Sequence, residues 1–202
     1  MVKAINNTEG NSSKSEQLAK TAYKLFMRHG IRRVSVEEIC KEAKISKMTF
    51  YKIFPNKIEL AKYILDKIFS EQMDVYRNTM KEKIPFARKV EKIILQKNKS
   101  TESLSEEFFK DLTKNPIAEI AELIKRFQQT SLDEVMKDLK SAQKKGEIRK
   151  NINLDFIVYF LNRIPDLMNE KKLNSIYNTP NELIMELTNF FFYGILTNKA
   201  EE

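Results

Sequence analysis

The chain has 202 residues, of which 42% are hydrophobic and 32% are charged, a balance typical of a globular protein with one large or two modest domains. Only 4 glycines and 5 prolines occur, too few for a sheet-rich fold with many tight turns. No run of about 18 apolar residues predicts a membrane-spanning helix, and residues 1–16 lack the apolar centre of a secretory signal. The single cysteine cannot form an internal disulfide. These features favour a cytoplasmic protein without a membrane partner.

The net charge of +8 is concentrated near the N-terminus. Residues 1–57 contain 12 Lys and Arg against 5 Asp and Glu, a balance of +7, whereas the remainder contains 24 against 23, a balance of +1. Binding of nucleic-acid phosphates with release of counterions needs such local positive charge. A merely solvated lysine-rich face would give the same count, so charge alone does not decide the function.

The first part of the chain predicts three short helices. Residues 1–13 are polar and are expected to form a disordered arm. A first helix is predicted from about Ser15 to His29, where Gly30 ends it as a C-cap. Apolar residues at helical spacing predict a second helix over residues 35–43.

A third helix follows directly over residues 47–54. Ser46 is a good N-cap for it, and Pro55 ends it because the residue before a proline resists the α conformation. Only residues 44–46 separate it from the second helix. Its outward-facing side chains are those of Lys47, Thr49, Tyr51 and Lys52. Two helices across a short turn predict a helix-turn-helix whose second helix enters the DNA major groove.

The rest of the chain also reads as helices. No strand-like alternation and no repeat appears, so we predict an all-α fold of about nine helices. Beyond the first three, the predicted helices cover residues 57–82, 85–96, 103–112, 116–145, 154–172 and 180–198. Ser103 with Glu106 and Thr179 with Glu182 are expected to form capping boxes.

The segment from Val34 to Lys57 resembles the DNA-binding motif of the TetR family of bacterial repressors. Matching residues there are Ser46, Lys47, Thr49, Phe50, Tyr51, Phe54 and Lys57, and those upstream are Ala19, Ala22, Leu25, Phe26 and Gly30. The specific part of the resemblance covers about residues 15–65. Two residues depart from the family pattern: Lys44 stands where glycine is usual, and Met48 where a small residue is common. A side chain in a left-handed turn costs about 1 kcal/mol, so either Lys44 tolerates this strain or the turn bends differently.

The resemblance implies a helix-turn-helix domain over residues 14–57 and an effector-binding and dimerisation domain over residues 58–202. In a recognition helix, N-terminal side chains meet base edges and residues further along reach phosphates. We therefore expect the groove face to include Lys47, Met48, Thr49 and Lys52. Tyr51 and Lys57 are assigned to phosphates. The resemblance further implies that Ser35 or Val36, at the start of the second helix, touches the DNA backbone, with Ser46 at the head of the third helix completing the set.

The last two helices are apolar over most of their circumference and must be covered. The chain's own core is one covering, and the resemblance implies another, a four-helix interface in a homodimer. Gly194 within the last helix is explained by a close helix crossing. The residues predicted for this interface are Phe156, Ile157, Leu161, Leu183, Leu187, Phe190, Phe191, Gly194 and Ile195.

Aromatic and methionine residues between the two ends of the chain read as core, and the resemblance implies that they enclose an effector cavity. The residues predicted to line it are Tyr76, Met80, Phe86, Phe108, Phe109, Phe127, Met136, Phe160, Ile164 and Met168. Their side chains favour an apolar or amphipathic effector. Arg126 and Arg163 are candidates for binding an anionic group on it.

No catalytic or metal-binding pattern emerges. His29 ends a helix, Cys40 lies on an apolar helix face, and neither phosphate-cradling glycines nor metal-ligand spacings occur. We predict no cofactor and no enzyme, but a homodimeric, ligand-responsive repressor that binds a near-palindromic operator. Movement of the helix that starts at Lys57 would couple effector to DNA. A thiol-sensing regulator and a DNA-binding accessory protein without a ligand remain alternatives.

Overall fold

Ten α-helices account for most of the computed structural model, which describes residues 9–102, 105–114 and 116–196. In chain order they are α1 (Glu9–His29), α2 (Val36–Glu42), α3 (Lys47–Ile53), α4 (Lys57–Lys81), α5 (Phe86–Thr101), α6 (Glu106–Thr113), α7 (Ala118–Lys144), α8 (Leu154–Asn169), α9 (Lys171–Asn174) and α10 (Pro180–Ile195). Within the described ranges the only extended pairing is an isolated antiparallel bridge between Ile148 and Leu196. The all-α prediction is confirmed.

Side-chain caps explain where the N-terminal helices begin. Ser35 and Ser46 each accept a hydrogen bond from the backbone N–H three residues ahead, at 3.1 Å in both cases. Asn56 does the same for α4, accepting from Ile58 N and Glu59 N at 2.8 and 2.9 Å. Helix α1 stops at Gly30, whose φ of +81° is the left-handed C-cap conformation that glycine adopts readily.

Several helix boundaries differ from the sequence-based expectation. Helix α1 begins at Glu9, so residues 9–13 are helical and only residues 1–8 of the expected arm lie outside the described residues. Once nucleated, a helix extends at little cost per residue, and residues 9–13 contain no proline to stop it. The cap of α6 is Ser105, whose Oγ accepts from Phe108 N at 3.2 Å; the expected cap, Ser103, lies outside the described residues.

The expected helix over 154–172 is divided into α8 and α9. Glu170 is extended, with ψ of 118°, and its carboxylate accepts from Lys172 N as the cap of α9. Asn174 Nδ2 donates to the carbonyls of Met168 and Glu170, both at 2.8 Å. These bonds satisfy carbonyls at the end of α8 and fix the break.

The first of two hydrophobic clusters joins the helix-turn-helix to the rest of the molecule. It contains apolar residues of α1 to α4, including Leu60 and Ile64, together with Phe108 of α6 and Ile120 and Leu123 of α7. A three-helix unit this small buries too little surface for independent stability. The packing of α4, α6 and α7 against it supplies the missing cover.

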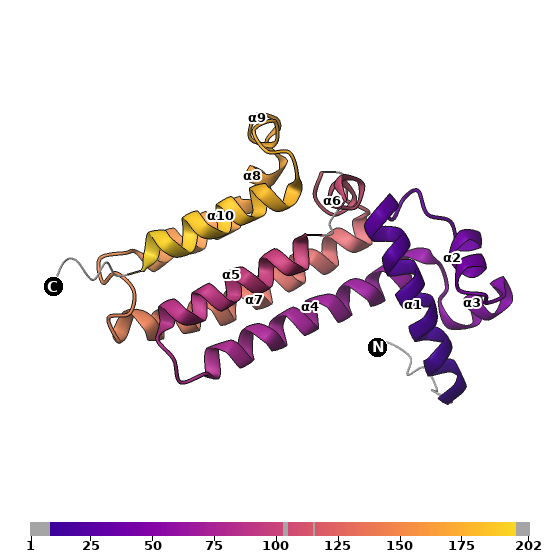
Figure 1. Cartoon of the computed structure of the whole chain (residues 1–202), viewed down its shortest axis with the longest axis horizontal. Coiled ribbons are helices and arrows are strands. Elements are labelled where there is room, and N and C mark those ends of the chain that lie inside the picture. Colours follow the sequence, from indigo (N-terminus) through magenta and orange to yellow (C-terminus); the bar gives the residue numbers. More distant parts are fainter. Residues whose placement is uncertain (1–8, 103–104, 115, 197–202) are drawn as a thin grey trace.

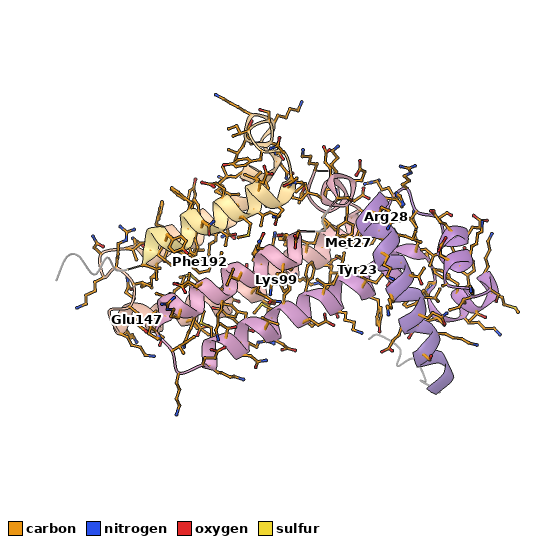
Figure 2. All side chains as sticks on the ribbon, in the orientation of Figure 1. Tyr23, Met27, Arg28, Lys99, Glu147 and Phe192 are labelled. Atoms are coloured by element: carbon orange, nitrogen blue, oxygen red, sulfur yellow. The ribbon has the colours of Figure 1, made fainter. Side chains whose placement is uncertain are left out.

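The second cluster holds α5, α7, α8 and α10 together. Its most buried members include Val90, Leu139, Ile148 and Ile157. Pro85 gives α5 no side-chain cap, and Glu147, which follows α7, accepts from Phe86 N at 3.1 Å instead (Figure 2). A carboxylate in this position also complements the positive end of the helix dipole.

The molecule is elongated, with α2 and α3 at one end and the C-terminal end of α10 toward the other (Figure 1). Helices α4, α5 and α7 run along its length, and α6 lies between α1 and α8. No helix within the described ranges is long and apolar enough to cross a membrane.

Candidate nucleic-acid interface

The turn between α2 and α3 is tight and left-handed at one residue. Lys44 has φ of +52° and is the only non-glycine residue of the described ranges with a positive φ. Lys44 N donates to Lys41 O at 3.2 Å and Ile45 N to Cys40 O at 2.9 Å, which satisfies the last carbonyls of α2. Ile45 packs against the first hydrophobic cluster. Lys44 therefore adopts the strained conformation expected at this departure from the family pattern.

Helix α3 is divided into a buried and an exposed face. Phe50 and Ile53 are buried in the first cluster, and Phe54 follows them at 7% exposed. The opposite face carries Met48, which is 70% exposed, and Tyr51, which is 55% exposed. Lys47 and Lys52 flank these two side chains and are also exposed. The structure thus brings a basic, partly aromatic face to the end of the molecule.

The two polar side chains in the first turn of α3 already have partners. Lys47 Nζ forms an ion pair with Glu37 Oε1 of α2, and this hydrogen bond raises the pKa of the lysine. Thr49 Oγ1 lies 3.0 Å from Ser46 Oγ. The role of Glu37 was not predicted, although its place on the outward face of the preceding helix was visible in the sequence.

Lys57, which is predicted to bind a phosphate, lies at the start of α4 and bonds to backbone carbonyls of the protein. Its ammonium donates to Arg32 O at 2.8 Å and to Val34 O at 2.7 Å, and burial lowers its pKa. It therefore ties the start of α4 to the loop between α1 and α2. Ser35 and Val36, also assigned to the DNA backbone, lie half-buried next to that loop.

A buried carboxylate on α6 holds the same loop from the other domain. Asp111 is 8% exposed, and its Oδ2 accepts from Arg32 N at 3.0 Å while its Oδ1 lies 3.3 Å from Arg32 Nε. Gly30 makes this approach possible, because a Cβ there would lie 2.8 Å from Asp111 Oδ2. Sequence reasoning missed this junction, since nothing in the pattern links residues 79 positions apart.

Cys40 is covered on the inner side of α2. It is 5% exposed, and burial is the main cause that raises the pKa of its thiol. A neutral, inaccessible thiol reacts slowly with oxidants. Among the described residues, no group of three or more His, Cys, Asp and Glu side chains is placed to hold a metal ion.

The residues predicted for an effector cavity do not surround a single hollow. Phe86, Phe108 and Phe109 are 3–4% exposed and lie in the protein core. Met80, Met136 and Phe160 pack against the second cluster, and Ile164 and Met168 are half-buried. The remaining two, Tyr76 and Phe127, lie where α4 meets α7.

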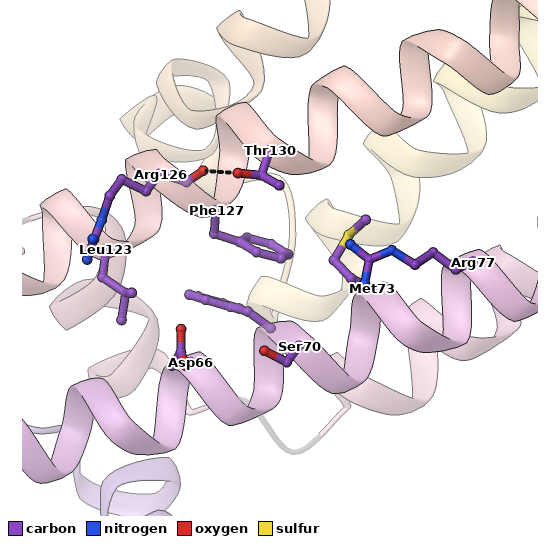
Figure 3. A pocket seen from close by; sticks show the side chains of 9 residues that line it. Asp66, Ser70, Met73, Arg77, Leu123, Arg126, Phe127 and Thr130 are labelled. Carbon is purple, nitrogen blue, oxygen red and sulfur yellow. Dashed lines mark hydrogen bonds between the residues drawn. The ribbon is translucent and has the colours of Figure 1, made fainter. Parts of the chain in front are cut away.

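A shallow hollow of about 290 Å³ opens between α4 and α7 (Figure 3). Phe127 lines it and stacks on Phe69 with ring centroids 4.2 Å apart. A larger open groove of about 620 Å³ lies between α1, α4 and α5, with Tyr23, Tyr63 and Lys99 in its walls. None of the other nine predicted cavity residues lines either hollow.

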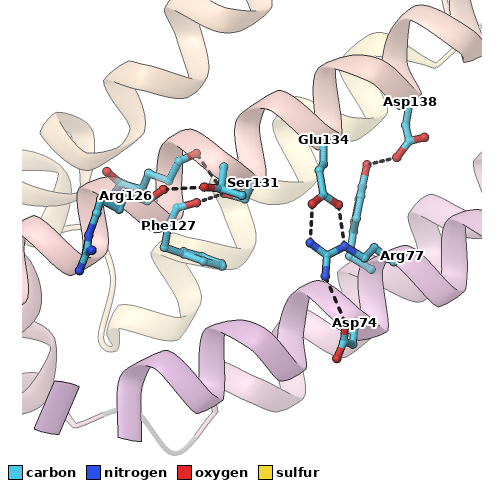
Figure 4. A network of polar contacts seen from close by, with 10 residues as sticks. Asp74, Arg77, Arg126, Phe127, Ser131, Glu134 and Asp138 are labelled. Atoms are coloured by element: carbon cyan, nitrogen blue, oxygen red, sulfur yellow. Dashed lines mark hydrogen bonds and ion pairs between the residues drawn. The ribbon is translucent and has the colours of Figure 1, made fainter. Parts of the chain in front are cut away.

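Beyond the hollow, polar contacts clamp α4 to α7 (Figure 4). Arg77 binds both carboxylate oxygens of Glu134 and also Asp74 Oδ1. Tyr76 donates its hydroxyl proton to Asp138 Oδ2 at 2.9 Å. Burial and the neighbouring carboxylate raise the pKa of this tyrosine. Tyr76 therefore holds two helices together and is not a free group in a cavity.

The predicted dimer residues divide into two sets. Ile157, Leu183, Phe191 and Ile195 are 1–7% exposed and belong to the core of their own chain, so they are not available to a partner. The prediction differed because an apolar sequence on all sides of a helix indicates that the helix is buried. It does not indicate whether the same chain or a partner chain buries it. On the outer side of α8 and α10, the exposed large side chains are Phe156 (60%), Tyr159 (61%), Phe190 (71%) and Tyr193 (58%). Leu161 and Leu187 are half-buried, and Gly194 is exposed with nothing within 4 Å of a Cβ built on it.

Residues 18–64 match the family described as "Bacterial regulatory proteins, tetR family". The chain carries the DNA-binding domain of the TetR family. An uncharacterised HTH-type transcriptional regulator of Bacillus subtilis (strain 168), YuxN, is 39% identical over 66 residues. That match covers 31% of this chain and only 23% of the length of YuxN.

Solved structures share the fold over nearly the whole TetR-like chain. SmeT, the repressor of the Stenotrophomonas maltophilia multidrug efflux pump SmeDEF, superposes with a TM-score of 0.68 at 16% identity and 95% coverage of each chain. A putative transcriptional regulator from Saccharomonospora viridis, in complex with choline, has a TM-score of 0.67 at 17% identity and covers 93% of this chain and 100% of its own. At such identities the likeness establishes the fold of the larger domain and nothing about its ligand.

Proposed function

We propose that this TetR-family regulator is a homodimeric repressor that binds a near-palindromic operator and is controlled by a small molecule. The observation that carries the proposal is the exposed face of α3. Met48, Tyr51 and their flanking lysines are exposed, and they belong to the segment, residues 1–57, that holds +7 of the +8 net charge. A helix presented in this way fits the major groove, and the cations satisfy phosphates.

The DNA contacts follow from position along α3. Lys47, Met48 and Thr49 stand in the first turn and face base edges, while Tyr51 and Lys52 in the second turn reach the groove wall and the phosphates. Ser35, Val36 and Ser46 bring the N-terminal ends of α2 and α3 to the DNA backbone, where free N–H groups favour anions. Lys57 supports this surface through the α1–α2 loop, and its ammonium has a third N–H with which to bind a phosphate.

Dimerisation is supported by the aromatic side chains that α8 and α10 expose. Phe156 and Phe190 leave a contiguous apolar surface uncovered, which is uncommon on a monomer. Gly194 gives a neighbouring helix room to approach. Two recognition helices then read half-sites about 34 Å apart, one turn of DNA.

Effector control is supported by the fold and by the junction between the domains. SmeT represses an efflux pump and the S. viridis regulator was solved with choline, so proteins of this fold combine repression and small-molecule binding. In the present chain, α6 reaches the α1–α2 loop through Asp111, and Lys57 grips the same loop from α4. A ligand that shifts α6 or α4 would thereby move the helix-turn-helix.

The proposal is tested by selecting sites from a random duplex library with the full-length protein, followed by sedimentation. We expect a two-fold symmetric site bound by two chains, and Lys52→Ala should lower the slope of log affinity against log salt by about 1. A protein that binds no duplex selectively, or that stays monomeric on its site, would refute the function. Effector control requires a second measurement: native mass spectrometry of the purified protein for a retained small molecule, whose removal must change operator affinity.

A further inference from the structure

The centre of the exposed face of α3 is apolar. Met48 is more exposed than Tyr51 on the same helix, and at about 100° per residue it lies almost opposite the buried Phe50 and Ile53. Lys47 and Tyr51 stand on one side of it and Lys52 on the other. An unbranched thioether therefore stands at the centre of the helix face that would enter a groove.

The neighbours of Met48 in the first turn have their polar groups engaged. The ammonium of Lys47 is paired with Glu37, so a carboxylate stands beside it and opposes an approach to the O6 and N7 acceptors of guanine. The hydroxyl of Thr49 is bonded to that of Ser46, which itself caps the helix. Met48 has no such partner to give up, and no hydrogen bond to donate.

Base edges in the major groove offer few groups that suit an apolar side chain. Guanine presents two acceptors, cytosine and adenine present amino groups, and thymine presents the 5-methyl group. A thioether placed against an amino group or an acceptor leaves that group without its water, whereas contact with a methyl group removes apolar surface from water. Thymine is therefore the base whose major-groove edge best suits an apolar side chain.

We propose that Met48 reads thymine in the operator through contact with its 5-methyl group. The inference rests on the proposed DNA-binding function and adds to it the chemical group that is recognised.

Replacing single thymines by deoxyuridine tests this directly, since the exchange removes the methyl group and leaves the Watson–Crick pairing intact. A duplex selected by the full-length protein is prepared with one thymine exchanged at a time. At one position of each half-site the exchange should weaken binding about fourfold, the loss expected for one methyl group returned to water. The Met48→Ala variant should bind the thymine and deoxyuridine duplexes with equal affinity. The Met48→Leu variant, which again has a large apolar side chain, should bind the deoxyuridine duplex more weakly than the thymine duplex.

Met48→Gln is the matched control, because glutamine has a similar length but is polar. It should bind the thymine and deoxyuridine duplexes alike while retaining the circular dichroism of the wild type, as expected for an exposed position. If no single exchange weakens the wild type, or if Met48→Ala keeps the same loss, the thymine reading is wrong although DNA binding stands. If the protein selects no site at all, the proposed function falls as well.

Discussion

At the scale of single residues, the helix-turn-helix is shaped by side chains that carry a cost. Lys44 adopts φ of +52°, a conformation in which its Cβ crowds the following carbonyl. Lys47 faces the DNA-binding side but shares its charge with Glu37. The conformation of Lys44 lowers local stability, and the pairing of Lys47 with Glu37 lowers the positive potential of the domain.

Lys44→Gly should relieve the turn. Glycine adopts positive φ without strain, so we expect a gain of about 1 kcal/mol in the free energy of unfolding, or roughly 2–4 °C in Tm for a chain of this length. Lys41→Gly is the control, because Lys41 lies inside α2 and glycine in a helix costs about 1 kcal/mol. Thermal melts in which Lys44→Gly is no more stable than the wild type would contradict a strained turn.

Glu37→Gln should strengthen binding to any duplex. The substitution removes a negative charge near the phosphates and releases Lys47, so affinity for random DNA should rise and the salt slope should steepen by about 1. Glu38→Gln removes the same charge from the same helix but leaves the Lys47–Glu37 pair intact, so it should leave the slope unchanged. Equal slopes for both variants, measured by titration at several salt concentrations, would show that Lys47 is available despite Glu37.

At the scale of secondary-structure elements, periodicity predicted the helices well. It predicted less well which residues pack against each helix face. The caps Ser46 and Thr179 were predicted correctly because a capping side chain acts on its own next turn. Ile157 and Phe156 are adjacent and both apolar, yet one is 1% and the other 60% exposed. Which of them faces the core depends on packing between distant helices, and so does the Asp111–Arg32 contact. The local sequence pattern predicts neither the buried face of α8 nor this contact.

One signal at this scale was present and was not used. Phe86, Val90 and Ile94 form the buried stripe of α5, and Lys97 follows in the same stripe at helical spacing. Although solvent reaches its side chain, the surrounding protein desolvates the ammonium and lowers its pKa. Desolvation is the sole influence on that pKa among the described residues, so no carboxylate offsets its cost. A polar residue retained in such a stripe is a reason to look for function there.

Lys97→Met should therefore stabilise the protein, and the gain should depend on pH. Below the lowered pKa the folded protein carries the charge at a desolvation cost, which is reduced because Lys97 remains exposed to solvent. As the pH rises toward the ordinary value of 10.5, the folded lysine becomes neutral while the unfolded one still binds a proton, so the wild type becomes relatively more stable. The difference in Tm should be largest near pH 7 and should shrink toward pH 10. Lys92→Met, at an exposed position paired with Glu82, should show no such narrowing gain.

The docking of α6 on the α1–α2 loop should be sensitive to its carboxylate. Asp111→Ala removes the buried carboxylate that accepts from Arg32 N in a part-buried hydrogen bond, so we expect a loss of about 1 kcal/mol in stability. Because the variant does not touch the proposed DNA surface, any change in operator affinity beyond the unfolded fraction reports coupling between the domains. Glu106→Gln, which breaks only the exposed pair with Lys110 on the same helix, should change neither quantity measurably.

At the scale of the whole molecule, the proposed recognition helix α3 and the helices α8 and α10, which expose aromatic side chains, lie in opposite regions of an elongated chain (Figure 1). This separation suits a protein in which one end pairs and the other reads DNA. A single helix-turn-helix contacts too few bases for useful specificity, whereas two joined chains gain from the high effective concentration of the second half-site. The proposed function therefore requires that the surface of α8 and α10 forms a dimer interface.

Phe190→Lys tests that surface. In a two-fold interface each residue is presented by both chains, so the substitution places two like charges in an apolar contact and should dissociate the dimer. Sedimentation velocity should show a monomer with an unchanged helical spectrum, since Phe190 is 71% exposed. Affinity for a duplex with two half-sites should fall about 100-fold or more, while affinity for one half-site should be unchanged. Leu95→Lys provides the control: Leu95 is 62% exposed on α5, and its substitution adds the same charge outside the proposed interface. If both variants remain dimers, or if both dissociate, the surface of α8 and α10 is not the interface that joins the two recognition helices.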